Sequence, residues 1–195
     1  MQIQINEQRL TGRWKAGWAL DLHTISSQLL PNGTFDTKYT EIGKLLNLLK
    51  YHFDKSKIEP IAETVASFLK MRLVFPYLKA IVPVPPSKLD RPFQPVQELA
   101  IKIGEKVNLP VPLDYLIKVK ETEPLKDIED TQNRKEQLKG AFKVNDNRFA
   151  RKYVLLFDDL FRSGETLNEI TNVLLQEDKV SKVFVLTITK TRIKR

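Results

Sequence analysis

An apolar run that ends in two adjacent carboxylates is the feature that most constrains the fold of this 195-residue chain. Residues 153–157 form the run, and Asp158 and Asp159 follow it. A short polar loop with one glycine, Gly164, then leads into a helical pattern over residues 165–176. This order predicts a buried strand with two acids at its carboxyl end, beside the free backbone N–H groups of a helix start. Such a site fits a phosphorylated sugar, because its hydroxyls can bind the acids and its phosphate the amides.

The chain alternates between strand and helix patterns from residue 78 onward. Core strands are predicted over residues 79–84, 113–119, 153–157 and 183–188, and helices over residues 94–106 and 165–176. Strands that alternate with helices form a mainly parallel sheet with helices on both faces, and ligands bind at the carboxyl ends of its strands. We therefore expect an α/β fold with Asp158 and Asp159 at the ligand-binding edge.

The first part of the chain has a different pattern. Residues 1–30 are predicted to be β-rich, and amphipathic helices are expected over residues 42–53 and 60–69. We expect one compact domain, in which residues 1–40 form a small β-rich hood and residues 41–195 form the core.

Composition sets further limits on function. The chain has no cysteine, so it forms no disulfide and no thiolate zinc site. No apolar stretch approaches the ~20 residues that a membrane span needs, and the N-terminus lacks a signal-peptide pattern, so we expect a cytoplasmic protein. The net charge of +8 has two interpretations: attraction of a phosphate-rich ligand or nucleic acid, or a solvated basic surface.

The segment over residues 153–166 resembles the phosphoribosyl-pyrophosphate (PRPP) signature of type I phosphoribosyltransferases. The resemblance implies the fold of that family and assigns Asp158 and Asp159, as catalytic acids, to the ribose hydroxyls. It also implies a PRPP-binding loop that cradles the 5′-phosphate and consists of Arg162, Ser163, Gly164, Glu165 and Thr166. Phe161 and Arg162 depart from the small residues that are usual at these positions.

Two upstream segments resemble the other two loops of such enzymes. The sequences of the three segments are most similar to those of the competence-protein ComF family. The pyrophosphate-loop candidate lies within residues 82–94 and offers Pro86, Ser87, Lys88 and Arg91. The flexible-loop candidate lies within residues 118–140 and offers Lys118, Lys120 and Arg134. Taken alone, the first segment fits a proline-rich turn with surface charges better, but its position before the acid pair favours the pyrophosphate loop. Any single residue of the second segment fits a solvated charged loop equally well.

The N-terminal region departs from the ComF pattern, because many members carry a cysteine zinc module there. Trp14, Trp18 and Tyr39 can stack on a base or belong to the core. His23 is a weak candidate for a catalytic base, and His52 beside an apolar helix face is expected to be structural.

The resemblance implies a phosphoribosyltransferase in which Mg²⁺ bridges the pyrophosphate and ribose hydroxyls of PRPP, with an unidentified nitrogenous base as acceptor. The ion is expected to be carried by PRPP without a dedicated protein cage, and Asp158 and Asp159 are possible contacts to it. The alternative is a non-catalytic PRPP-binding regulator, or a ComF-like accessory factor in DNA uptake that binds single-stranded DNA or a protein of the competence machinery. The sequence does not determine the oligomeric state, and a homodimer is one option.

Overall fold

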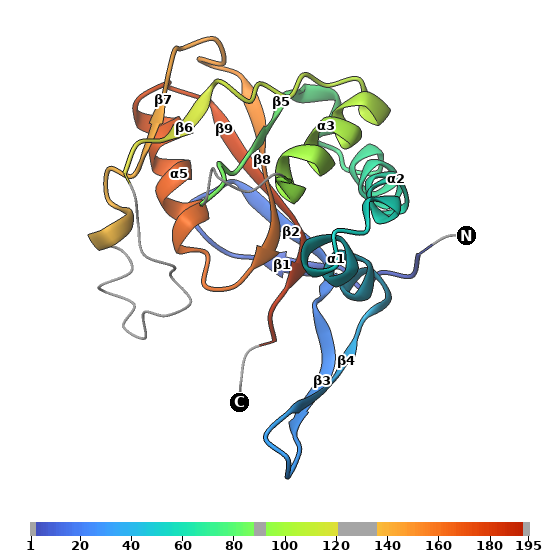
Figure 1. Cartoon of the computed structure of the whole chain (residues 1–195). Coiled ribbons are helices and arrows are strands. Elements are labelled where there is room, and N and C mark those ends of the chain that lie inside the picture. The colour runs from blue at the N-terminus through green and yellow to red at the C-terminus, as the bar shows by residue number, and fades with distance from the viewer. Residues whose placement is uncertain (1–2, 88–92, 121–135, 193–195) are drawn as a thin grey trace.

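A five-stranded sheet forms the centre of the computed structural model, which describes residues 3–87, 93–120 and 136–192 (Figure 1). Its order is β1 (Gln8–Leu10), β2 (Ala16–Leu22), β9 (Lys182–Lys190), β8 (Tyr153–Phe161) and β5 (Leu78–Pro83). The β1 strand is antiparallel to β2, and every other neighbouring pair is parallel. The predicted α/β fold with a mainly parallel sheet is confirmed.

Helices cover both faces of this sheet. One face carries α1 (Glu41–Tyr51), α2 (Ile58–Lys70) and α3 (Pro95–Val107), and the other carries α5 (Glu165–Gln176). Side chains of β8 alternate between the two cores: Leu155 and Phe157 pack with the first three helices, whereas Val154 and Leu156 pack with α5. Two 3₁₀ turns, η1 (Lys55–Lys57) and η2 (Phe75–Tyr77), precede α2 and β5.

Two small antiparallel sheets lie apart from the central one. One pairs β3 (Thr24–Leu29) with β4 (Phe35–Tyr39), and the other pairs β6 (Leu116–Lys118) with β7 (Phe142–Val144). The strand predicted over residues 113–119 was therefore wrong as a strand of the central sheet. The β6 strand is short and pairs only with β7, while β2 takes the position beside β9.

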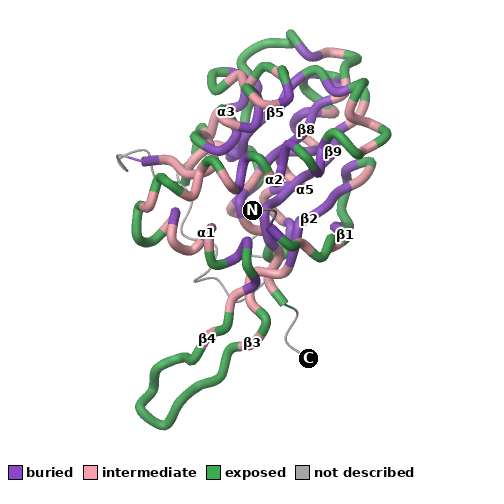
Figure 2. Tube along the Cα trace, turned by 90° about the vertical axis from the view of Figure 1, so that its right-hand side faces the viewer, coloured by how far each residue is buried: buried purple, intermediate pink, exposed green. Residues whose placement is uncertain are grey.

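The N-terminal region is divided between two parts of the fold. Five consecutive residues of β2 are buried, which suits a strand inside a sheet that is covered on both faces. The β3–β4 hairpin instead projects from the body, and Figure 2 shows it as mostly exposed. Pairing in the central sheet thus extends into residues 1–40, whereas the hairpin forms a separate sheet.

The two tryptophans belong to the core. Trp14 is buried and its indole N–H donates to the Leu10 carbonyl at 3.1 Å. Trp18 is buried and stacks on Phe184, with 6.3 Å between ring centroids. Neither ring is therefore placed to stack on a ligand.

No helix in the described ranges is long and apolar enough to cross a membrane.

Candidate functional site

The two acids lie within β8, beyond the point where its neighbour β5 ends. The last pair between β5 and β8 joins Pro83 with Phe157, whereas β8 continues alongside β9 and pairs Asp158 with Thr187. The strand predicted over residues 153–157 is thus four residues longer, because β9 supports it as far as Phe161. One side of β8 is free of β5 where the acids stand, as the carboxyl edge of a parallel sheet requires for a ligand site.

Asp159 is buried and forms an ion pair with Lys50 of α1. The distance from Lys50 Nζ to Asp159 Oδ2 is 2.7 Å. Asp159 follows Leu155 and Phe157 at alternate positions, so it faces the same helix layer as they do. Sequence reasoning missed Lys50. A signal existed, because Lys50 follows Ile42 and Leu46 on the apolar face of the helix, where a charge is unusual.

The two acids lie in different electrostatic environments. Burial and the neighbouring charge of Asp159 raise the pKa of Asp158 to about 7. Burial disfavours the Lys50 ammonium, but the charge and hydrogen bond of Asp159 outweigh it, so the pKa of Lys50 is raised. Lys50 and Asp159 therefore form a charged pair, while Asp158 exchanges its proton near neutral pH.

The start of α1, the helix that carries Lys50, is joined to the end of β2. The Thr40 hydroxyl accepts the Gly43 N–H at 3.1 Å and donates to the Leu22 carbonyl at 2.6 Å. A Cβ added to Gly43 would lie 2.1 Å from the His23 carbonyl oxygen, so only glycine allows this approach. Strand and helix are thus joined firmly at the edge that carries the acids.

His23 lies directly after β2, at the same edge. Its Nδ1 is 3.1 Å from the Thr189 hydroxyl, and its ring meets Tyr39 edge-on at 5.4 Å. Burial lowers the pKa of His23, and the nearby charges of Lys50 and Arg162 lower it further against the opposing effect of Asp159. A neutral imidazole at neutral pH follows. His52 is the C-cap of α1 and is exposed.

The loop after β8 leads directly into the N-terminus of α5. Gly164 has φ 81° and is the N-cap of α5, so the amides of Glu165 and Thr166 open the helix. Arg162 and Ser163 are exposed beside them. The predicted helix start at residue 165 is confirmed.

The Phe161 side chain packs against this loop at Gly164. It is buried and meets Trp14 edge-on, with 6.3 Å between ring centroids. A Cβ added to Gly164 would lie 2.9 Å from Phe161 Cε2, so the ring and the glycine fit against each other. The bulky residue that departs from the family pattern thus has a packing role.

The other two predicted loops are described only in part. The Val84 N–H donates to the Phe157 carbonyl at 2.9 Å, which starts the pyrophosphate-loop candidate next to Asp158. Pro86 is partly buried and Ser87 is exposed, whereas Lys88 and Arg91 lie outside the described residues. In the flexible-loop candidate, Lys118 ends β6 and Lys120 is exposed, and Arg134 lies outside the described residues.

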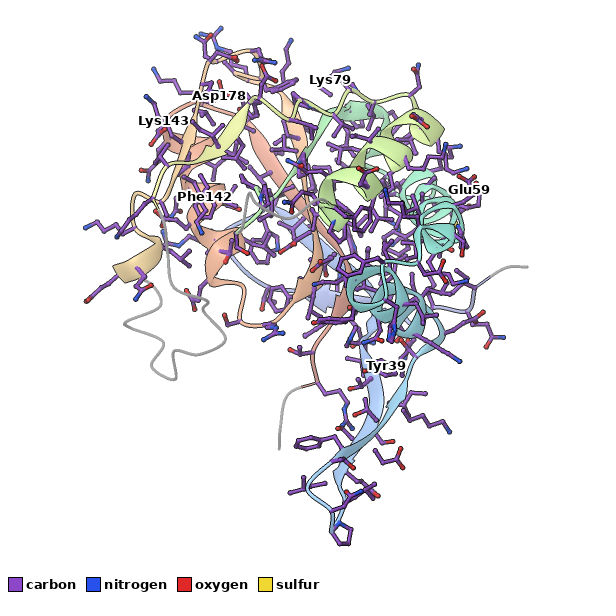
Figure 3. All side chains as sticks on the ribbon, in the orientation of Figure 1. Tyr39, Glu59, Lys79, Phe142, Lys143 and Asp178 are labelled. Atoms are coloured by element: carbon purple, nitrogen blue, oxygen red, sulfur yellow. The ribbon has the colours of Figure 1, made fainter. Side chains whose placement is uncertain are left out.

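Another buried acid, Asp178, is remote from this edge. Figure 3 shows it at the opposite end of the molecule from Tyr39, which lies at the base of the hairpin. Asp178 Oδ2 accepts the hydroxyl of the fully buried Tyr115. Burial raises the pKa of Asp178 against the lowering effect of that hydrogen bond. We regard this pair as part of the core.

Comparison with known proteins shows the fold. Neither a protein-family model nor a curated protein matches the sequence. Adenine phosphoribosyl transferase from Trypanosoma brucei, in complex with AMP, pyrophosphate and ribose-5-phosphate, superposes with a TM-score of 0.51 and 15% identity. The match covers 86% of this chain and 76% of that one. The fold is that of the type I phosphoribosyltransferases.

Two other solved structures are similar at lower scores. The glutamine PRPP amidotransferase from B. subtilis matches with a TM-score of 0.47 and 15% identity over 83% of this chain, which spans only 35% of the amidotransferase. A hypoxanthine phosphoribosyltransferase from Staphylococcus aureus matches with a TM-score of 0.37 and 20% identity, over 70% of this chain and 68% of that one. The narrower likeness to the ComF family stays a prediction.

Proposed function

We propose that the protein binds PRPP and transfers its phosphoribosyl group to, or from, a nitrogenous base. The observation that carries this proposal is the acid pair of β8, Asp158 and Asp159, placed beside the helix start that Gly164 opens. The carboxylates can accept from the ribose hydroxyls of a ribose 5-phosphate, and the free amides of the helix start can donate to its phosphate. The phosphoribosyltransferase fold supports the same assignment.

The proposed reaction is a displacement at the anomeric carbon of the ribose. A nitrogen of the base forms a bond to this carbon, and the bond from the carbon to the pyrophosphate oxygen breaks. Pyrophosphate leaves with the electron pair. Positive charge develops on the sugar in the transition state, so nearby carboxylates stabilise it and the leaving group needs positive charge of its own.

Each segment has a proposed role in this reaction. Asp158 and Asp159 accept hydrogen bonds from the ribose hydroxyls, and the loop from Arg162 to Thr166 binds the 5′-phosphate. Pro86, Ser87, Lys88 and Arg91 form the pyrophosphate site, and Lys118, Lys120 and Arg134 belong to a loop that closes over the ligand. The last two sets rest on the resemblance, since parts of both lie outside the described residues.

Mg²⁺ is expected from the resemblance, and the acid pair does not suit it as a direct ligand set. Asp159 already carries the Lys50 ammonium at 2.7 Å. In the part of the chain that the structure describes, no group of three or more histidine, cysteine, aspartate or glutamate side chains is placed to hold a metal ion. We therefore assign no step to a protein-held Mg²⁺, and leave the ion to the diphosphate of PRPP itself.

Calorimetry with Mg·PRPP tests the proposal. The wild-type protein is expected to bind, and the Asp158→Asn, Asp159→Asn double variant to lose binding. Asp36→Asn on the exposed hairpin is the matched control, because it also removes a carboxylate and should bind as the wild type does. A screen of bases that monitors pyrophosphate release then identifies the acceptor. Absence of PRPP binding by the wild type would overturn the proposal.

A non-catalytic role is the second candidate. One observation favours it: Asp159 is already paired with Lys50, so one of the two acids is partly engaged. A regulator would bind PRPP and release no pyrophosphate with any base. An accessory factor in DNA handling would bind single-stranded DNA with steep salt dependence and be indifferent to the Asp158 and Asp159 variants.

A further inference from the structure

The ion pair between Lys50 and Asp159 puts a positive charge inside the candidate sugar site. The side chains of the pair are only 21% and 11% exposed, and 2.7 Å separates Lys50 Nζ from Asp159 Oδ2. Water and salt screen such a sheltered pair far less than a surface pair. The ammonium therefore lies at the acid pair as part of the candidate site.

The remaining hydrogen-bonding groups of the pair are arranged to hold a hydroxyl-bearing ligand. Asp158 Oδ1 accepts the Asp159 N–H at 2.8 Å, and Asp159 Oδ2 accepts from Lys50. Within the described ranges, no other group bonds to these two carboxylates, so one oxygen of each is left to accept from a ligand. An ammonium has three N–H donors, and Lys50 uses one of them on Asp159.

A hydroxyl group both donates and accepts, so it matches this mixture of carboxylate and ammonium. The charge of the ligand also favours a cation at this position. Two adjacent carboxylates repel the phosphate of a sugar phosphate, and a cation at the pair removes that repulsion. A divalent ion would be one such cation. The ammonium of Lys50 already stands there, attached to the chain.

We infer that Lys50 takes the place of a divalent cation at the acid pair. Its ammonium neutralises Asp159 and donates to a ribose hydroxyl oxygen, so the sugar-phosphate end of the ligand binds without Mg²⁺. This inference rests on the proposed function. It concerns the ribose 5-phosphate end alone and makes no claim about the diphosphate.

Calorimetry with ribose 5-phosphate, which has no diphosphate to carry Mg²⁺, provides the test. The full chain is titrated in EDTA and in millimolar Mg²⁺, as wild type, Lys50→Met, Lys50→Arg and Lys44→Met. Lys44 lies on the same helix and is exposed, so Lys44→Met removes an equal charge away from the site. Thermal unfolding of each variant shows that it is folded.

The expected wild-type affinity is the same with and without Mg²⁺, within about twofold. Lys50→Met should bind roughly tenfold more weakly in EDTA and recover in Mg²⁺, because the unneutralised acid pair then needs an ion. Lys50→Arg should keep Mg²⁺-independent binding, and Lys44→Met should match the wild type. This change in Mg²⁺ dependence is one that a purely structural role would not produce.

Three results would overturn the inference while leaving the proposed function intact. In the first, the wild type binds only with Mg²⁺. In the second, Lys50→Met lowers the melting temperature but responds to Mg²⁺ as the wild type does. In the third, Lys50→Met binds more tightly than the wild type in EDTA, which would make Lys50 a block. If the wild type binds neither ribose 5-phosphate nor PRPP under either condition, the proposed function fails, and the inference fails with it.

Discussion

Lys50 and Asp159 meet across the boundary between α1 and β8, with 2.7 Å between Nζ and Oδ2. Each of these groups is costly to bury alone, and each is stabilised by the other. The pair therefore links the helix that follows the hairpin to the strand that carries the acid pair. It also makes the two adjacent acids differ, since Asp159 has a cationic partner at contact distance and Asp158 has none among the residues that the structure describes.

Breaking this pair on one side should destabilise the protein. Asp159→Asn leaves a sheltered ammonium without its counter-charge, at an expected cost of about 2 kcal/mol in the free energy of unfolding. The double variant Lys50→Met, Asp159→Asn should recover most of that loss. Urea unfolding of the four members of the double-mutant cycle measures the coupling. The exposed pair Lys102–Glu105 is the control and should show little coupling. Equal coupling in both cycles would contradict the sheltered character of the Lys50 pair.

Asp158→Asn should raise the free energy of unfolding relative to the wild type at alkaline pH, whereas Asp159→Asn lowers it. The pKa of Asp158 is raised to about 7 in the folded protein, from an ordinary value of 3.8, by burial and by the charge of Asp159. The folded state holds this proton more tightly than the unfolded state. The resulting stability is complete below the unfolded pKa and is lost as the pH rises through 7.

The variant lacks this titration. Between about pH 5 and pH 8, its free energy of unfolding relative to the wild type should therefore rise by on the order of 2 kcal/mol. Chemical unfolding of both proteins across this range provides the measurement. A difference between them that is flat with pH would argue against a protonated Asp158.

Gly164→Ala should lower the free energy of unfolding for two separable reasons. Gly164 has φ 81°, and its added Cβ would also lie 2.9 Å from Phe161 Cε2. Gly33 has nearly the same φ, 80°, but an added Cβ there meets no atom of the described residues within 4 Å. Gly33→Ala should cost about 1 kcal/mol from the backbone alone, and Gly164→Ala about 1–2 kcal/mol more from the clash.

Thermal or urea unfolding of both variants checks this difference. Phe161→Leu combined with Gly164→Ala should remove part of the extra cost, because the smaller side chain makes room for the methyl group. Similar losses in the two glycine variants would mean that the contact with Phe161 carries no energy.

Tyr115→Phe should destabilise the core at the end of the sheet remote from the candidate site. Asp178 Oδ2 accepts the Tyr115 hydroxyl, and Asp178 Oδ1 is buried with no partner among the described residues. Removal of the hydroxyl takes away the donor that the structure shows for this carboxyl, at a cost of about 1–3 kcal/mol. The hydrogen bond lowers the pKa of Asp178, so its loss raises that pKa further and the destabilisation should grow as the pH rises. Unfolding at several pH values tests this, and PRPP binding should be unchanged.

Local signals in the sequence predicted the central part of the candidate site. An apolar run, two acids and a glycine before an amphipathic pattern placed Asp158, Asp159 and the helix that starts at residue 165, because strand burial, turn chemistry and helix periodicity all act over a few residues. The end of β8 was predicted too early. Its extension to Phe161 depends on hydrogen bonds from β9, a partner that the local pattern does not contain.

The sequence by itself determined the α/β class and the order of strand, acid pair and helix start. Only the tertiary structure decided that β2 lies beside β9 and that Lys50 reaches Asp159. Both are contacts between segments far apart in the chain. A buried β-strand pattern does not specify its neighbour, and a lysine near the end of a helix is ordinarily solvated. Packing of the whole chain selects the partner in each case, so the residue that sets the charge of the acid pair emerges only in the folded protein.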